Sequence, residues 1–157
     1  MARAASIVEE RVRQSFEAAT LAARQYDAAG PNKEWAIEPR VAHFLDHLIR
    51  LERPASVLEF GAGSSSVTIA RAISATGGGR LTSVDHAPQY CREQWQLVQA
   101  QAGVDARLAC GPLRPRLRWQ GLFYQYAGVS KVLAERAPFD FVVIDAPPGD
   151  YGRDGVL

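Results

Sequence analysis

The sequence has little of several features that would mark a specialised class of protein. Only two of its 157 residues are cysteines, Cys91 and Cys110, too few for a disulfide framework or a cysteine-rich metal site. Its formal net charge of +1 gives no strong overall field to attract nucleic acid or a membrane surface. No apolar run approaches the length of a bilayer span, and the first residues lack the apolar segment of a secretory signal. We therefore expect a cytoplasmic protein with reduced cysteines, no metal site, and neither nucleic acid nor membrane as a partner.

The length and composition of the chain predict a single domain, residues 1–157. Hydrophobic residues make up 47% of it, enough for a sizeable core at this length. Apolar residues at helical spacing predict an amphipathic helix over 2–28, within an N-terminal segment 1–30, and a second helix over 37–51. Strand and helix patterns then alternate through a core spanning residues 35–150. This alternation predicts an α/β fold with a parallel sheet. The expected strands are 57–60, 81–84, 106–109 and 139–145, and the expected helices are 64–75, 88–102 and 129–136.

The segment between the third and fourth expected strands has two interpretations. Residues 116–126 read either as a hairpin that turns at Gln120–Gly121 or as a loop over a pocket, and we favour the hairpin. Arginines at alternate positions, Arg114, Arg116 and Arg118, would then share one face, which we interpret as a solvated edge rather than a phosphate-binding stripe.

The stretch SVLEFGAGSSSVTIARAI, residues 56–73, joins the first strand to a helix through two glycines. Gly61 and Gly63 allow a close approach to the backbone, and a helix that begins near Ser64 offers free N–H groups to a carboxylate or a phosphate. Two ligand classes fit, a dinucleotide and S-adenosylmethionine. The dinucleotide fingerprint G-x-G-x-x-G is incomplete, because Ser66 occupies its last place.

Glu59 favours the second ligand. A carboxylate two residues before the first glycine would repel a pyrophosphate and attract an ammonium and a sulfonium. The alternative is that Glu59 only caps the loop by accepting backbone hydrogen bonds.

Residues after the second and third strands extend the expected site. Asp85 could accept hydrogen bonds from two ribose hydroxyls, or it could be the N-cap of the following helix. His86 could lie along an adenine, or it could simply be a surface histidine. Gly111 would leave space for the adenine ring, with Cys110 beside it.

Together, the residues Glu59-Phe60-Gly61-Ala62-Gly63 and the later Asp85 resemble the class I S-adenosylmethionine-dependent methyltransferases, and FDFVVIDAPPGD resembles their fourth strand and the loop after it. The resemblance implies a Rossmann-like sheet of order 3-2-1-4 with helices on both faces. It implies that Glu59, Gly61, Ala62, Gly63 and Ser65 lie near the methionine part of the cofactor, and Asp85 on the ribose. This chain departs from the family at Ser65, where a third glycine is common.

A second departure from the family is length. Members usually continue through three more strands, whereas this chain ends twelve residues after Asp145. This favours a truncated product, a fragment or a minimal relative of the family. An uncovered apolar fourth strand would promote aggregation, so we expect self-association, with a second copy of the chain covering its edge.

The resemblance leads to one main functional hypothesis, methyl transfer from S-adenosylmethionine to oxygen or nitrogen of a small molecule. Asp145, at the end of the fourth strand, would act as general base or orient the acceptor; a turn cap is the alternative for it. Ala146 stands where a base-amine methyltransferase would need a polar residue, which argues against a nucleic-acid acceptor. The competing hypotheses are a catalytically inactive module that binds S-adenosylmethionine and a nicotinamide-dependent dehydrogenase.

Overall fold

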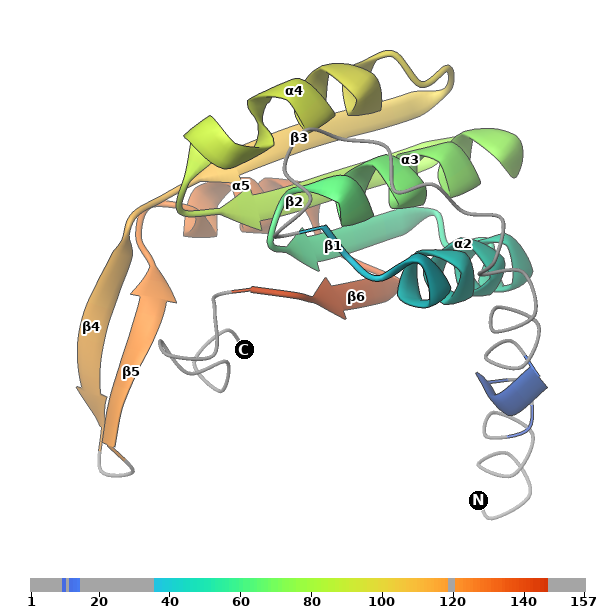
Figure 1. The fold of residues 1–157 in the computed structure, drawn as a ribbon. Coiled ribbons are helices and arrows are strands. Elements are labelled where there is room, and N and C mark those ends of the chain that lie inside the picture. Colours follow the sequence, from blue (N-terminus) through green and yellow to red (C-terminus); the bar gives the residue numbers. More distant parts are fainter. Residues whose placement is uncertain (1–9, 11, 15–35, 119–120, 147–157) are drawn as a thin grey trace.

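The computed structural model describes residues 10, 12–14, 36–118 and 121–146 (Figure 1). The expected helix over 2–28 lies mostly outside these residues, although Glu10 and residues 12–14 are helical. None of the helices in this described part has the length and apolar character that a membrane-spanning segment needs.

The core is a four-stranded parallel sheet of order β3-β2-β1-β6. This confirms the predicted α/β class and strand order, because β6 is the fourth strand expected from the sequence. The elements follow the chain as α2 (Pro39–Glu52), β1 (Ser56–Phe60), α3 (Ser64–Ala75), β2 (Gly79–Asp85), α4 (Pro88–Gln99), β3 (Val104–Cys110), β4 (Leu113–Arg118), β5 (Gly121–Tyr126), α5 (Ser130–Arg136) and β6 (Phe141–Ile144).

The last strand begins two residues later than the sequence predicts. Asp140 stands before β6, and its carboxylate accepts hydrogen bonds from the backbone N–H groups of Ala55 and Ser56 at 2.9 and 3.0 Å. Its own N–H donates to the Ser56 carbonyl at 2.9 Å. Asp140 therefore ties the start of β6 to the start of β1 and fixes the register that pairs Phe60 with Ile144.

Helices cover both faces of the sheet, as expected, and each face has its own apolar cluster (Figure 1). Because side chains alternate along a strand, Val57 of β1 joins the cluster under α2, α3 and α4, whereas Leu58 and Phe60 join the cluster on the α5 side. All five residues of β1 are buried, as is typical of a central parallel strand. By the same alternation Glu59 lies on the α3 side.

α5 is short and has no fully buried residue: Val132 and Leu133 pack, partly buried, against the cluster on this face, and polar contacts add to their hold. The Arg136 guanidinium donates to the Asp105 carboxylate at 2.5 Å, to the Asp105 carbonyl at 2.6 Å and to the Thr82 hydroxyl at 3.2 Å. One arginine thereby fastens the helix before β6 to β2 and β3.

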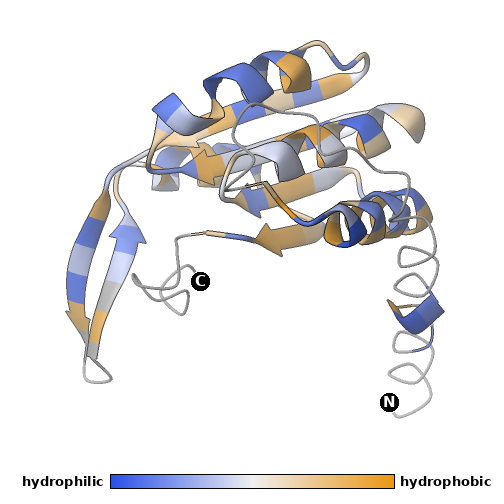
Figure 2. Cartoon of the chain, viewed as in Figure 1, coloured by the Kyte–Doolittle hydropathy of each residue, from blue (hydrophilic) through white to orange (hydrophobic). Residues whose placement is uncertain are grey.

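The segment between β3 and α5 is a hairpin, as predicted. β4 and β5 pair antiparallel with Leu113 opposite Tyr126, and the ribbon stands away from the sheet (Figure 1). Its outer part alternates polar and apolar residues (Figure 2), and Leu117 is 84% exposed.

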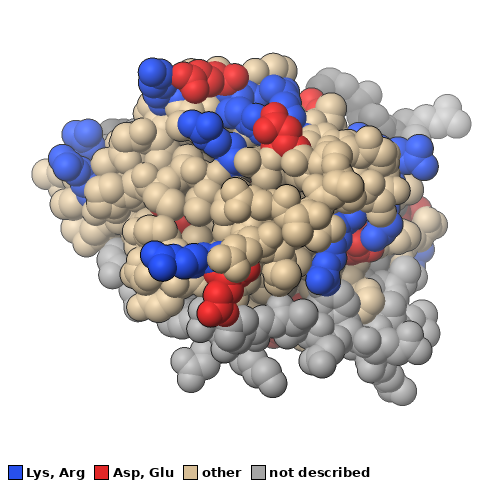
Figure 3. All heavy atoms as spheres, turned by 90° about the horizontal axis from the view of Figure 1, so that it is seen from above, with Lys and Arg blue, Asp and Glu red and all other residues tan. Residues whose placement is uncertain are grey.

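On the helical face seen from above, basic and acidic side chains are interspersed (Figure 3). That agrees with a net charge near zero. At the open side of the sheet, β6 pairs with β1 alone among the described strands, and Val142 and Ile144 are exposed. The self-association expected for this edge stays a prediction.

Two adjacent glycines in the turn between α3 and β2 offer a matched test of local packing. Gly77 and Gly78 both have positive φ, 105° and 97°. A Cβ at Gly77 would meet nothing within 4 Å, whereas a Cβ at Gly78 would lie 2.5 Å from the Gly103 carbonyl oxygen. We expect Gly77→Ala to lower the free energy of unfolding by about 1–2 kcal/mol through backbone strain alone. Gly78→Ala should cost clearly more in urea denaturation, and equal losses for the two variants would contradict this packing.

Candidate functional site

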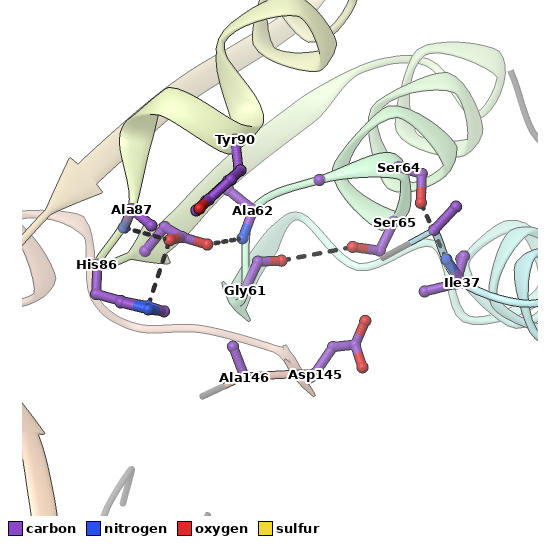
Figure 4. A pocket seen from close by; sticks show the side chains of 13 residues that line it. Ile37, Gly61, Ala62, Ser64, Ser65, His86, Ala87, Tyr90, Asp145 and Ala146 are labelled. Carbon is purple, nitrogen blue, oxygen red and sulfur yellow. Dashed lines mark hydrogen bonds and ion pairs between the residues drawn. The ribbon is translucent and has the colours of Figure 1, made fainter. Parts of the chain in front are cut away.

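A cavity of about 390 Å³ opens at the carboxyl ends of β1, β2 and β6 (Figure 4). This is the edge where open parallel sheets bind ligands, and the volume lies in the range of small-molecule sites. The lining comes from four places: the segment before α2, the turn from β1 into α3, the turn from β2 into α4, and the residues after β6. The lining residues are Ala36, Ile37, Gly61, Ala62, Gly63, Ser64, Ser65, Asp85, His86, Ala87, Tyr90, Asp145 and Ala146.

The two glycines of the β1–α3 turn are required for different reasons. Gly61 has φ of 100°, and a Cβ there would lie 2.7 Å from the Cβ of Ala146, so the protein itself demands glycine. Gly63 is extended, with φ of −178°, and a Cβ there would meet no atom of the described residues within 4 Å. The packing of the described residues therefore does not explain Gly63, which lines the cavity. Close approach of a ligand would explain it.

Asp85 joins the two turns that form the cavity wall. One carboxylate oxygen accepts from the Ala62 N–H at 2.8 Å, and the other accepts from the Ala87 N–H at 2.7 Å (Figure 4). Ala87, not Asp85, is the N-cap of α4, so Asp85 holds the turn before this helix instead of capping the helix itself. Each oxygen keeps further lone-pair capacity, and Asp85 lines the cavity. Capping the turn and binding a ligand are therefore compatible roles.

Glu59 is fully buried behind the turn and is not among the residues that line the cavity. Three hydroxyls donate to its carboxylate: Ser65 at 2.6 Å, Ser66 at 2.6 Å and Ser83 at 2.5 Å. Burial raises the pKa of Glu59 to about 7; the three hydroxyls oppose this shift, and the charge of Asp145 adds to it. As the alternative to a ligand contact, we expected Glu59 to accept hydrogen bonds from backbone N–H groups. Its partners in the structure are side-chain hydroxyls instead.

The structure brings most of the other predicted residues to the cavity, but not all. His86 lines it, with Nδ1 3.6 Å from an Asp85 carboxylate oxygen. Cys110 is exposed and, like Gly111, does not line it. A Cβ at Gly111 would collide with the Ala127 carbonyl oxygen, so the path of the chain before α5 already requires a glycine there, and the adenine contact of Gly111 stays a prediction.

Sequence reasoning missed several lining residues. Ile37 donates its N–H to the Ser64 hydroxyl at 3.1 Å and so closes the cavity beside the start of α3. Tyr90 lies in the first turn of α4. The distance of Tyr90 from Asp85, five residues along the chain, could have indicated its place, whereas nothing in the sequence pairs Ile37 with Ser64.

The described lining residues of the cavity include acidic side chains and lack lysine and arginine. Asp85 and Asp145 contribute carboxylates, and no lysine or arginine is present among these thirteen residues. Asp145 follows β6 directly, and its N–H donates to the Phe60 carbonyl at 2.8 Å, which holds it beside the end of β1. Within the described residues no cluster of three His, Cys, Asp or Glu side chains is placed to bind a metal.

No family model and no curated protein matches this sequence. Solved structures do match it. The S-adenosylhomocysteine-bound methyltransferase PaMTH1 of Podospora anserina superposes with a TM-score of 0.52 at 15% identity, over 92% of this chain and 58% of that one. The O-methyltransferase TomG of Streptomyces achromogenes, involved in tomaymycin synthesis and solved with S-adenosylmethionine, gives 0.45 at 22% identity, over 84% and 53%. The likeness to PaMTH1 confirms the Rossmann-like fold of this chain, which spans less than two thirds of the PaMTH1 chain.

The raised pKa of Glu59 predicts how stability changes with pH. The carboxyl group holds its proton up to about pH 7 when folded, against 4.5 for the ordinary group, so the folded state binds more protons between these values. The contribution of Glu59 is therefore complete below pH 4.5 and is lost as the pH rises through 7. Because the amide of Glu59→Gln cannot ionise, the free energy of unfolding of the wild type relative to this variant should fall by about 3 kcal/mol across that window. Urea denaturation at a series of pH values measures it, and a constant difference would show that Glu59 does not titrate there.

Proposed function

We propose that this protein binds S-adenosylmethionine and transfers its methyl group to an oxygen or nitrogen of a small molecule. The observation that carries the proposal is the acidic cavity at the carboxyl ends of the strands, with two carboxylates and no lysine or arginine among its described lining residues. A dinucleotide would bring a pyrophosphate to this wall, whereas S-adenosylmethionine brings an ammonium and a sulfonium. The fold that the chain shares with PaMTH1, which was solved with S-adenosylhomocysteine, supports the same ligand.

Each part of the wall suits one part of that ligand. Asp85 can accept hydrogen bonds from the ribose hydroxyls while it keeps its two backbone partners. The open side of Gly63 and the first N–H groups of α3 suit the carboxylate of the methionine part. His86, beside Asp85, suits the nucleoside end.

Asp145 is the residue we assign to the acceptor side. S-adenosylmethionine supplies an electrophilic methyl group, so the protein has to align the acceptor and remove any proton that it loses. Asp145 is exposed at the cavity and anchored through its backbone to Phe60. Its carboxylate can accept a hydrogen bond from an acceptor hydroxyl or amine and take up that proton.

A substitution at Gly63 tests ligand binding separately from folding. Gly63→Ala introduces no contact within 4 Å and no positive φ, so the free energy of unfolding should change by less than about 1 kcal/mol. The methyl group would occupy ligand space, and we expect the affinity for S-adenosylhomocysteine in titration calorimetry to fall at least tenfold. NAD and NADP, titrated alongside, should not bind the wild type. Tight binding of either dinucleotide would replace this proposal with a dehydrogenase, and tight S-adenosylhomocysteine binding without turnover in an acceptor screen would favour an inactive binding module.

Asp85 provides a second test, of the ribose contact. Asp85→Ala should lower the affinity for S-adenosylhomocysteine and for adenosine by a similar factor, on the order of tenfold or more, because both ligands carry the ribose. Asp46→Ala is the matched control: it removes an aspartate of α2 that pairs with Arg50 and does not line the cavity. Unchanged affinity in the Asp85 variant would remove this residue from the ligand site.

A further inference from the structure

Glu59 and three serines form a closed polar cluster beneath the cavity. Glu59 and Ser83 are register partners on β1 and β2, so their side chains lie on the same face of the sheet. Ser65 and Ser66 come from the first turn of α3, which covers that face. All four residues are buried, with Glu59 at 0% exposure, and the carboxylate accepts one hydrogen bond from each hydroxyl. The cluster is therefore built around a carboxylate that the proposed chemistry does not use.

Only one member of this cluster reaches the ligand space. Ser65 lines the cavity, and Figure 4 shows its hydroxyl near the Gly61 carbonyl, at 3.5 Å. Ser66 and Ser83 do not line it. Ser65 is thus the one member of the cluster whose own side chain lines the cavity, whereas Ser66 is linked to the wall only through the Gly63 N–H, from which its hydroxyl accepts a hydrogen bond at 3.0 Å.

We propose that Glu59 is a positioning residue that acts on the ligand through Ser65, so that binding of a cationic ligand is coupled to the loss of one proton from Glu59. This inference rests on the proposed function, because S-adenosylmethionine is the cationic ligand. It differs from direct contact, which the burial of Glu59 behind the turn does not allow.

The coupling follows from the hydrogen-bonding capacity of the two groups. An ionised carboxylate can only accept, so the Ser65 hydroxyl must donate to it and keeps its own lone pairs for a positive group in the cavity, such as the sulfonium. A protonated Glu59 has one O–H to donate. If Ser65 receives it, the Ser65 proton turns away and presents a donor to the cavity. A cation in the cavity favours the first state, both through Ser65 and through the charge of Glu59.

The proton balance is simple. The ligand binds to protein in which Glu59 is protonated, and Glu59 is ionised in the resulting complex. The proton that Glu59 loses passes to the buffer. Burial already places the pKa of Glu59 at about 7, so a substantial share of molecules carries the proton near neutral pH.

Other titratable groups face the same region. Asp145 follows β6 and raises the pKa of Glu59 by its charge. Asp85 and His86 line the cavity from the β2–α4 turn. The Cys91 thiol of α4 interacts with both Glu59 and Asp85, and burial raises its pKa to about 11, so it stays neutral. The experiment has to separate the effect of His86 from that of Glu59, because a positive charge on His86 would also repel a cation.

A comparison of two ligands isolates the effect of charge. S-adenosylmethionine carries the sulfonium that S-adenosylhomocysteine lacks. For the wild type we expect the ratio of their affinities to shift toward S-adenosylmethionine by on the order of tenfold between about pH 6 and 8. In Glu59→Gln the ratio should be constant, and in His86→Asn the shift should persist. Calorimetry near pH 6.5 in two buffers of different ionisation enthalpy should detect proton release with the wild type and none with Glu59→Gln.

The two serines of α3 provide a matched pair. Ser65→Ala and Ser66→Ala each remove one 2.6 Å bond to Glu59 from a buried position, and Ser66→Ala also leaves the Gly63 N–H without its acceptor, so Ser66→Ala should cost at least as much stability. Only Ser65→Ala removes a hydroxyl that lines the cavity, and it should weaken S-adenosylmethionine binding at least threefold more than Ser66→Ala.

The outcomes distinguish this inference from the function on which it rests. If neither ligand binds, the proposed function fails. If both ligands bind and the ratio of their affinities does not depend on pH, the function stands and the coupling is overturned. The same holds if the ratio does depend on pH but the dependence disappears in His86→Asn and remains in Glu59→Gln. Equal affinity losses in the two serine variants would also overturn it.

Discussion

The burial of one carboxylate governs the architecture around the cavity. A carboxylate taken out of water is costly unless its oxygens are satisfied, and Glu59 sits at the centre of the sheet with no exposed surface. Its three serine partners lie on β2 and in the first turn of α3. Satisfying Glu59 therefore fixes the start of α3 against the sheet, and that placement in turn sets the path of the glycine turn. The cavity wall is in this sense a consequence of how a buried charge is accommodated.

A second carboxylate holds the opposite wall. Asp85 spans the turns after β1 and β2 through the N–H groups of Ala62 and Ala87. The turn after β6 approaches from the third side, where Gly61 leaves room for Ala146. Three loops that are distant in sequence thus converge, and each is held by a backbone contact rather than by side-chain packing. Such anchoring defines a site before any ligand arrives, which lowers the ordering cost of binding.

Much of this fold could be predicted from the sequence because local signals agreed. Apolar strands alternated with helices, so the α/β class and the hairpin were predicted correctly, and the resemblance to a known family supplied the strand order. The contribution of Glu59 was harder to predict. Its spacing from Gly61 suggested a ligand contact, but strand alternation turns it toward α3, and only the fold brings Ser83 to its side. Gly111 was assigned to a ligand for a similar reason, whereas the Ala127 carbonyl occupies the space beside it. Ile37 reaches the cavity through tertiary packing, for which the chain carries no local signature, whereas the spacing of Tyr90 from Asp85 was a local signal that went unused.

The single arginine that fastens α5 links two distant parts of the molecule. Arg136 lies on the α5 side of the sheet, yet α5 leads directly into β6, and β6 delivers Asp145 to the cavity. Because Val132 and Leu133 of α5 are only partly buried, the forked geometry of one guanidinium supplements a small apolar contact. A lysine at 136 would preserve the charge but would lose the fork that reaches the carboxylate, the carbonyl and the hydroxyl together.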